Sequence, residues 1–445
     1  MPDMREPPPI GYLIPEFPGQ THTWIWREVC HMREAGARIQ VFSTRRPPDR
    51  DRARHSFADN AAEQTTYLHP AGAARLARAL LAVGLRHPIG LCRAVRTALA
   101  LPVEAKPNLR TVLPLLAPAL CLADDAKRLG LQHLHVHACS NSAVIAMLAK
   151  DLSGMPFSLT LNANIDWWGG AMAEKFSAAR FTIAITDWLE KQVRDRFPQL
   201  RDDQVQLGRI GVDTLKWRPK ESSPPSTAED RPLQLISFGR LHPSKGYTTL
   251  LRALDLFAKR PDAVPVHLTL IGDGPQRAEL EALTNELGLA PHVTFAGSQS
   301  EDFIIDQLND ADVFVLSSKA EPLGVVTMEA MAMGVAVIAT DAGGVREIVT
   351  DGQDGLLVPP EDAAALAEAL ADLATHPERR EQLAHAGRDS IVQRFDSRYG
   401  AATLYQRLFG ERPTHLLQAL ADTPPDASAS PADHPPSAPA EAVQA

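Results

Sequence analysis

The chain has 445 residues, of which 44% are hydrophobic and 22% charged, so it is long enough for two ordinary domains and too apolar for a disordered protein. Its 54 Asp and Glu against 45 Lys and Arg give a net charge of -9, which argues against a protein whose whole surface binds nucleic acid. Four cysteines without a Cys-x-x-Cys pair indicate reduced thiols in a cytosolic protein rather than a disulfide framework or a zinc site.

The beginning of the chain does not resemble a secretory signal. Its first residues, MPDMREPPPIG, place prolines where such a signal needs an apolar core of about 7–15 residues. The longest apolar run, TVLPLLAPALCLA from Thr111, is interrupted by Pro114 and Pro118 and falls short of the roughly 20 residues that span a bilayer. We therefore expect a cytoplasmic protein.

Strand-like apolar runs alternate with helical patterns through the first half of the chain. Residues 24–35 and 142–152 have the helical pattern, and the apolar runs are IGYLIPEF, RIQVFST, HLHVHA, FSLTLNA and FTIAIT. This alternation predicts parallel βαβ units.

A second series of the same kind follows the segment ESSPPSTAEDRP at 221–232, whose composition is typical of an interdomain linker. Helical patterns at 250–259, 278–287 and 325–333 alternate with the runs LQLISFGR, VHLTLIGDG, HVTFAGS, DVFVLSS and VAVIATDAGG. The sequence therefore predicts an α/β protein with two Rossmann-like, doubly wound domains that face each other across a cleft.

The last 25 residues hold six prolines, four acids and no Lys or Arg, a composition that cannot form a core. We expect a first domain at 1–215, a linker at 216–232, a second domain at 233–395, a helix at 396–420 that packs back on the first domain, and a disordered tail at 421–445.

Two glycine-rich turns in the second half do not fit the common nucleotide signatures. GRLHPSKG is not a Walker A loop, because Lys245 precedes the glycine, and IGDGPQR has Arg277 where a dinucleotide fingerprint needs a third glycine. Arg240 and Lys245 nevertheless follow a predicted buried strand. Some eighty residues later, Glu321 and Glu329 flank a predicted helix start, which with the two cations would suit a phosphate.

These residues resemble a known family. GRLHPSKG, IGDGP, EPLGVVTMEAMAMGVAV and DAGGVRE are similar to the donor domain of retaining glycosyltransferases of family 4, which have the GT-B fold. EFPGQTHTWIWRE, HLHVHA and FSLTLNAN look like the acceptor half of the branch that makes exopolysaccharides of the colanic acid or amylovoran type. The resemblance covers residues 10–415 and implies a hexosyltransferase that uses a nucleotide-diphosphate sugar.

The resemblance also implies roles for particular residues. Arg240, Lys245 and Glu321 would be the catalytic residues. Arg240 and Lys245 would bind the donor diphosphate, and Glu321 would contact the transferred sugar. Further donor contacts would come from Glu329 at the ribose and from Gly239, Leu323, Gly324, Val325 and Val326. The acceptor and diphosphate side would be formed by Gly19, Asn162 and His137, although many family members have a histidine where this chain has Asn162.

The implied reaction needs no metal and no cofactor, because the leaving phosphate is thought to help deprotonate the acceptor. His135 and His137 share one face of a strand, but no partner has ligand spacing, so we expect no metal site. Residues 70–110 hold seven Lys or Arg and one acid. This basic amphipathic stretch suits either an anionic membrane surface, where a polyprenyl-linked acceptor would sit, or a solvated helical insertion.

Two other functions remain open from the sequence. One is a non-catalytic sugar-nucleotide-binding or scaffold protein, suggested by Asn162. The other is a sugar-nucleotide epimerase of the same fold, or a phosphorylase, although the histidine and acid pattern of the first and the pyridoxal-lysine context of the second are missing.

Overall fold

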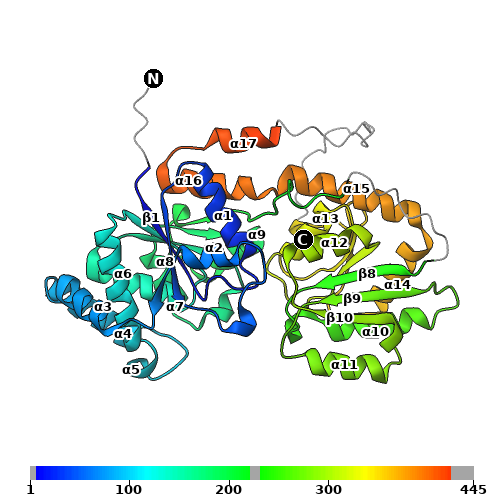
Figure 1. The fold of residues 1–445 in the computed structure, drawn as a ribbon, viewed down its shortest axis with the longest axis horizontal. Coiled ribbons are helices and arrows are strands. Elements are labelled where there is room, and N and C mark those ends of the chain that lie inside the picture. Colours follow the sequence, from blue (N-terminus) through cyan, green and yellow to red (C-terminus); the bar gives the residue numbers. More distant parts are fainter. Residues whose placement is uncertain (1–6, 221–230, 422–445) are drawn as a thin grey trace.

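The computed structural model describes residues 7–220 and 231–421. Within these residues the chain forms two α/β domains side by side, each around a parallel sheet (Figure 1). The predicted pair of doubly wound domains is confirmed. Most of the predicted linker, and the predicted tail beyond its first residue, lie outside the described residues.

The first sheet has seven strands in the order β3-β2-β1-β4-β5-β6-β7, all paired in parallel. Five of them coincide with the predicted apolar runs. The two strands that the sequence did not predict are the edge strands β3, which is half polar, and β7, which has three residues. The strands are β1 Ile10–Ile14, β2 Ile39–Arg45, β3 Thr65–His69, β4 His133–His137, β5 Phe157–Leu161, β6 Thr182–Ala184 and β7 Val205–Leu207.

The second sheet has six parallel strands in the order β10-β9-β8-β11-β12-β13. Its interior strands are almost continuously buried, as is typical of a parallel sheet covered on both faces. The short edge strand β13 was again not predicted. The strands are β8 Leu233–Phe238, β9 Val266–Ile271, β10 Val293–Gly297, β11 Val313–Leu316, β12 Ala336–Thr340 and β13 Leu356–Val358.

Helices pack on both faces of each sheet (Figure 1). In the first domain they are α1 Thr23–Glu34, α2 Ala58–Glu63, α3 Ala73–Ala79, α4 Pro88–Ala100, α5 Asn108–Thr111, α6 Leu116–Arg128, α7 Asn141–Ser153, α8 Met172–Ala178 and α9 Asp187–Arg196. The later helices are α10 Tyr247–Ala258, α11 Arg277–Glu286, α12 Glu301–Asp310, α13 Val325–Ala332, α14 Ala363–Thr375, α15 Pro377–Arg394, α16 Ser397–Phe409 and α17 Thr414–Ala421. In the described part of the chain, no helix combines the length and apolarity needed to cross a bilayer.

The chain passes between the domains twice, and the two passages lie against each other. The N–H of Val212 donates to the carbonyl of Phe395 at 2.9 Å, and the N–H of Ser397 donates to the carbonyl of Val212 at 2.9 Å. A Cβ on Gly211 would come within 2.1 Å of the Phe395 carbonyl, so only glycine allows this approach. The passages are therefore paired like two short strands.

After the second passage the chain returns to the first domain. Helix α16 lies against α1 (Figure 1), and the His31 ring is 2.9 Å from the Ser397 hydroxyl. Leu404 and Tyr405 share a buried cluster with Ile25 and Val29 of α1. The segment that we expected at 396–420 thus forms α16 and most of α17.

Candidate active site

A cleft of about 1070 Å³ lies between the two domains. Loops that follow strands of both sheets form its walls, which is where a doubly wound sheet binds ligands. All the donor-side residues implied by the resemblance line it, together with Gly19 and Asn162: Gly239, Arg240, Lys245, Glu321, Leu323, Gly324, Val325, Val326 and Glu329.

Two cations lie on the wall of the cleft that the second domain forms. Arg240 follows β8, is exposed, and forms no ion pair with any residue in the described ranges. Lys245 lies in the next turn, and its Nζ is 2.5 Å from the Glu321 carboxylate. Gly246 continues this turn with φ +66°, and a Cβ there would lie 1.9 Å from the Ser317 carbonyl. Position 246 therefore has to be glycine for this turn to direct Lys245 toward Glu321.

Glu321 is held in the loop between β11 and α13. Ser318 donates to its carboxylate at 3.1 Å, and the N–H of Gly344 donates to its carbonyl at 3.0 Å. A Cβ on Gly344 would meet the Pro322 carbonyl at 2.1 Å, which explains the small residue in the DAGG segment. The loop leads directly into α13, whose first N–H groups have no partner within the helix and border the cleft at Val325 and Val326.

Glu329 lies one turn into α13 and is 6% exposed. Burial raises the pKa of its carboxyl to about 8, although Arg27 of α1 acts in the opposite direction. The Arg27 guanidinium is 3.9 Å from the Glu329 carboxylate. The Glu329 carboxyl therefore keeps its proton over much of the neutral range.

A buried network of charges crosses from one domain to the other beside Glu329. The centre of this network is Glu301, the first residue of α12. Its carboxylate is 2.8 Å from Arg27 and 2.6 Å from Lys216, and it accepts from the Trp217 indole at 3.0 Å. Burial alone would raise the pKa of Glu301, but Arg27 and Lys216 together hold it below its usual value.

This network was not predicted from the sequence. Arg27 and Glu301 are 274 positions apart, and although Arg27 belongs to the motif EFPGQTHTWIWRE, nothing in that motif points to Glu301. The feature of the sequence that could have indicated a buried charge here is the adjacent pair Arg27 and Glu28 within the apolar pattern of α1.

His137 occupies a different place from Gly19 and Asn162. It is fully buried and packs edge to face against Trp24, which lines the cleft, with the ring centroids 5.2 Å apart. Its Nε2 is 3.0 Å from the Glu28 carboxylate. His137 thus lies behind the cleft wall, while the buried side-chain oxygen of Asn162 has no hydrogen-bond partner in the described protein.

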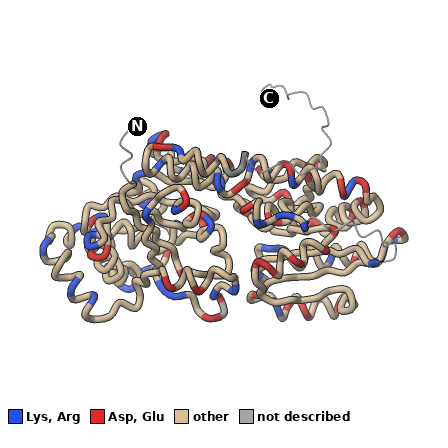
Figure 2. The backbone as a smooth tube through the Cα atoms, turned by 45° about the horizontal axis from the view of Figure 1, so that its top comes forward, with Lys and Arg blue, Asp and Glu red and all other residues tan. Residues whose placement is uncertain are grey.

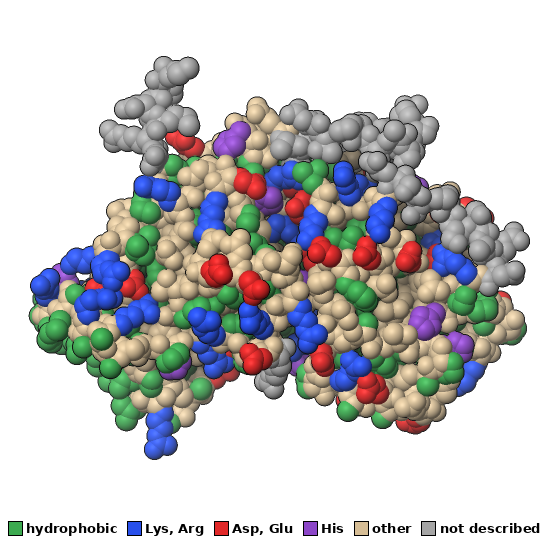
Figure 3. Space-filling model, in the orientation of Figure 1, with side chains coloured by type: hydrophobic (Ala, Val, Ile, Leu, Met, Phe, Trp, Pro, Cys, Tyr) green, Lys and Arg blue, Asp and Glu red, His purple; other side chains and the backbone are tan. Residues whose placement is uncertain are grey.

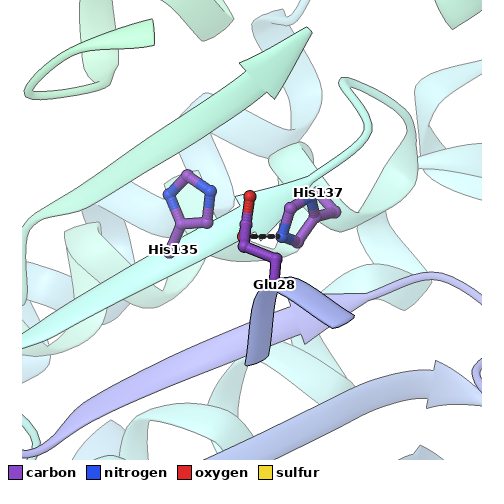
Figure 4. A group of neighbouring side chains, drawn as sticks. All are labelled: Glu28, His135 and His137. Atoms are coloured by element: carbon purple, nitrogen blue, oxygen red, sulfur yellow. Dashed lines mark hydrogen bonds and ion pairs between the residues drawn. The ribbon is translucent and has the colours of Figure 1, made fainter. Parts of the chain in front are cut away.

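Glu28 joins His135 and His137 in a cluster that the sequence did not reveal (Figure 4). One donor atom of each lies within 4.8 Å of the others, and the closest pair that is bonded directly is Glu28 and His137 at 3.0 Å. Both ring nitrogens of His135 are already within 2.9 Å of the Ser158 and Thr160 hydroxyls. The residues as they stand form a hydrogen-bonded unit rather than a set of free ligands.

The buried carboxyl of Glu329 predicts a pH-dependent stability. Its ordinary pKa is 4.5 and its folded value about 8, so between these values the folded protein holds a proton that the unfolded chain has lost. Its contribution to stability falls as the pH rises through this window. We expect Glu329→Gln, which has no proton to lose, to become more stable relative to the wild type from pH 5 to pH 8.

Urea unfolding at several pH values measures this difference. The matched control is Glu286→Gln on α11, which removes the same charge from an exposed position. An equal pH-dependent gain in that control would show that burial of Glu329 is not the cause.

Comparisons with known proteins agree with this geometry. The sequence profile of the family described as "Glycosyl transferases group 1" matches residues 219–390. Alpha-maltose-1-phosphate synthase of Mycolicibacterium smegmatis is 32% identical over 322 residues, which are 65% of this chain and 82% of that protein. The lipopolysaccharide core biosynthesis glycosyltransferase LpsE of Rhizobium meliloti is 36% identical over 187 residues, 42% of this chain.

The match spans 52% of the length of LpsE and 46% of the length of the related LpsD, so it covers about half of each. Two solved structures share the fold over nearly the whole chain. Anabaena HepE in complex with UDP and glucose has a TM-score of 0.64 at 18% identity, covering 93% of this chain and 100% of that one. Sucrose-phosphate synthase of Thermosynechococcus elongatus has a TM-score of 0.69 at 21% identity, covering 90% of this chain and 99% of that one. The expected GT-B fold is confirmed.

Proposed function

The chain belongs to the glycosyl transferases group 1 family, and from this premise we propose that it is a retaining glycosyltransferase of the family 4 type. It moves a hexose from a nucleotide-diphosphate sugar to a saccharide or lipid-linked saccharide. The observation that carries the proposal is the convergence of Arg240, Lys245, Glu321 and Glu329 with the start of α13 in one interdomain cleft.

The charges of the cleft suit the proposed donor. Arg240, Lys245 and the free N–H groups at the start of α13 offer donors to a diphosphate. Lys245 is paired with Glu321, so a bound diphosphate would compete for the lysine and leave the Glu321 carboxylate facing the sugar. Glu329 lies deeper and would accept hydrogen bonds from ribose hydroxyls.

The proposed reaction breaks the bond between the sugar C1 and the diphosphate oxygen, and the electron pair goes to that oxygen. Arg240, Lys245 and the start of α13 stabilise the developing negative charge. The acceptor hydroxyl oxygen bonds to C1 on the same face, and its proton passes to the leaving phosphate, so the configuration is retained. We propose that no metal and no cofactor takes part.

The relatives favour a surface glycan as the product. LpsE and LpsD are named as enzymes of lipopolysaccharide core biosynthesis. Together with the acceptor-half motifs of the colanic acid or amylovoran type, this supports exopolysaccharide or cell-surface glycan assembly. We place the protein in the cytoplasm, at the inner face of the membrane.

A panel of UDP, GDP and ADP sugars tests the donor in a thermal-shift assay. A ligand at 100 times its dissociation constant adds about 2.7 kcal/mol of stability, so one base should raise the melting temperature by several degrees. Release of nucleoside diphosphate on adding an acceptor then tests transfer. No shift with any nucleotide would contradict the proposal, and binding without turnover would favour the scaffold alternative.

The predicted basic stretch forms a helical projection at the end of the first domain that is far from the second domain (Figure 1). Six of the ten large hydrophobic side chains exposed in the described residues belong to it: Leu80, Leu81, Leu85, Ile89, Leu99 and Leu109. Figure 2 shows Lys and Arg positions along this projection, and Figure 3 shows basic and hydrophobic side chains gathered at this end of the molecule. Exposed apolar and basic groups together suit the surface of an anionic bilayer, and we propose that this projection binds it.

Vesicle binding tests the membrane contact. We expect the double variant Leu85→Ser and Ile89→Ser to bind vesicles that contain anionic lipid at least tenfold more weakly, because each side chain is more than half exposed and burying one contributes about 1.5–3 kcal/mol. Leu256→Ser, an exposed leucine of α10, is the control. Wild-type binding that does not depend on anionic lipid would contradict the proposal.

A further inference from the structure

A second pocket, of about 580 Å³, lies beside the cleft in the first domain. It is formed at the carboxyl ends of β2 and β3, where Arg45 and His69 face each other in the strand register. Arg45 lines both this pocket and the cleft, so the two spaces adjoin. The volume is within the range of about 300–1,000 Å³ that small-molecule sites occupy.

The pocket is strongly basic. Arg45, Arg46, Arg75 and His69 line it, and the remaining lining residues include no Asp or Glu. Such a concentration of cations in a chain with a net charge of -9 requires an anionic ligand or a solvated surface. The positions of the arginines decide between these two.

Each arginine is fixed by contacts within the protein, to the lining residue Tyr67 or to carboxylates that do not line the pocket. Arg46 lies over the Tyr67 ring, with its guanidinium carbon 4.3 Å from the ring centroid, and it forms no ion pair with any described residue. Arg75 donates to the Tyr67 carbonyl at 2.6 Å and pairs with Asp125, and Arg45 pairs with Glu16. Guanidinium groups held in this way lose little freedom when they bind a phosphate, which they can contact with two hydrogen bonds each.

The surroundings of the pocket indicate what carries the anion. On one side Arg45 leads to the cleft and to Gly19. On the other side Arg75 belongs to α3, the first helix of the apolar and basic projection. The pocket therefore shares one lining residue with the cleft and another with the helix that begins the projection.

We propose that this pocket binds the phosphate or diphosphate of the sugar acceptor, with Arg46 and Arg75 as the main contacts. The proposal rests on the transferase function proposed above and adds to it the chemical class of the acceptor. The same anion occurs in a soluble sugar phosphate and in a lipid-linked sugar diphosphate, and the test below separates these sources.

Calorimetric titration with inorganic pyrophosphate tests the pocket. The titration is carried out on the double variant Arg240→Ala and Lys245→Ala, which removes both cations of the proposed donor diphosphate position. We expect binding, and we expect Arg46→Ala added to that variant to weaken it roughly 10- to 100-fold, because a hydrogen-bonded charge contact is lost. Arg93→Ala on the exposed face of α4 makes the same change in net charge outside the pocket and should leave the affinity unchanged.

A short-chain isoprenyl diphosphate and a hexose 1-phosphate, titrated in the same way, identify the source. Tighter binding of the isoprenyl compound indicates a lipid-linked acceptor, and tighter binding of the sugar phosphate indicates a soluble one. No pyrophosphate binding, or equal affinity with and without Arg46, would overturn the proposal.

Binding of the donor nucleotide can be tested separately from binding in this pocket. In Arg46→Ala alone, the thermal shift caused by the donor nucleotide should equal that of the wild type, because Arg46 does not line the donor wall. If no nucleotide raised the melting temperature of the wild type, the transferase proposal would be contradicted. The pyrophosphate titration would still report on the pocket.

Discussion

Lys245→Ala is expected to lower the rate of sugar transfer by about 10²–10³-fold, the usual loss when a preorganised group that stabilises transition-state charge is removed. Lys245 lies on the donor wall within reach of Glu321, and no other lysine lines the cleft. The measurement is the turnover number at saturating donor, with release of nucleoside diphosphate as the readout. Lys245→Arg keeps the charge and should recover part of the rate.

Two controls separate chemistry from folding in this experiment. Lys259→Ala removes an exposed lysine directly after α10 that pairs with Asp255 and should leave turnover unchanged. Ser318 still donates to Glu321 when Lys245 is absent, so the melting temperature of Lys245→Ala should stay close to that of the wild type. Near-normal turnover in Lys245→Ala would show that Lys245 is not a catalytic residue.

Glu301→Ala is expected to destabilise the protein by about 3–5 kcal/mol, because it leaves a buried charge without its main partner. Arg27 is 8% exposed. Without Glu301 it keeps the Gly211 carbonyl at 3.5 Å and the Glu329 carboxylate at 3.9 Å, both longer than the contact it loses. Urea unfolding followed by tryptophan fluorescence measures the loss, and Trp217, which donates to Glu301, reports on the site itself.

The same helix provides the matched control. Asp306→Ala on α12 removes an exposed pair with Lys220, and such pairs contribute less than about 1 kcal/mol. Arg27→Ala should cost less than Glu301→Ala, since Glu301 keeps Lys216 and Trp217. Equal and small losses in Glu301→Ala and Asp306→Ala would mean that the buried network does not hold the domains together.

The sequence predicted the interior strands well because strands of a covered parallel sheet are apolar on both faces. IGYLIPEF, for example, contains β1, whose five residues are all buried. The edge strands β3, β7 and β13 were missed because they are short or half polar and gain their structure from a neighbour. Their formation depends on the sheet that is already present.

The nearness of Glu321 and Glu329 in the cleft could be predicted for a similar reason. Glu321 and Glu329 belong to one continuous loop and helix, so their spacing along the chain fixes their spacing in space. The pairing of Arg27 with Glu301, and the meeting of Arg46 with Arg75, depend on how distant segments pack. The position of His137 also depends on packing. The alternation of side chains along β4 predicts the face of the sheet on which His137 lies, but it does not reveal that Trp24 separates His137 from the cleft.

The paired passages at Val212 and Phe395 limit how the two halves can move. Because both covalent connections lie side by side, we expect the two halves to rotate about this point. Such a rotation changes the distance between Arg27 and Glu301 but leaves the hydrogen bonds of Val212 in place. Dyes placed on the two domains far from the passages would report opening, and a dye pair at the passages would serve as a fixed reference.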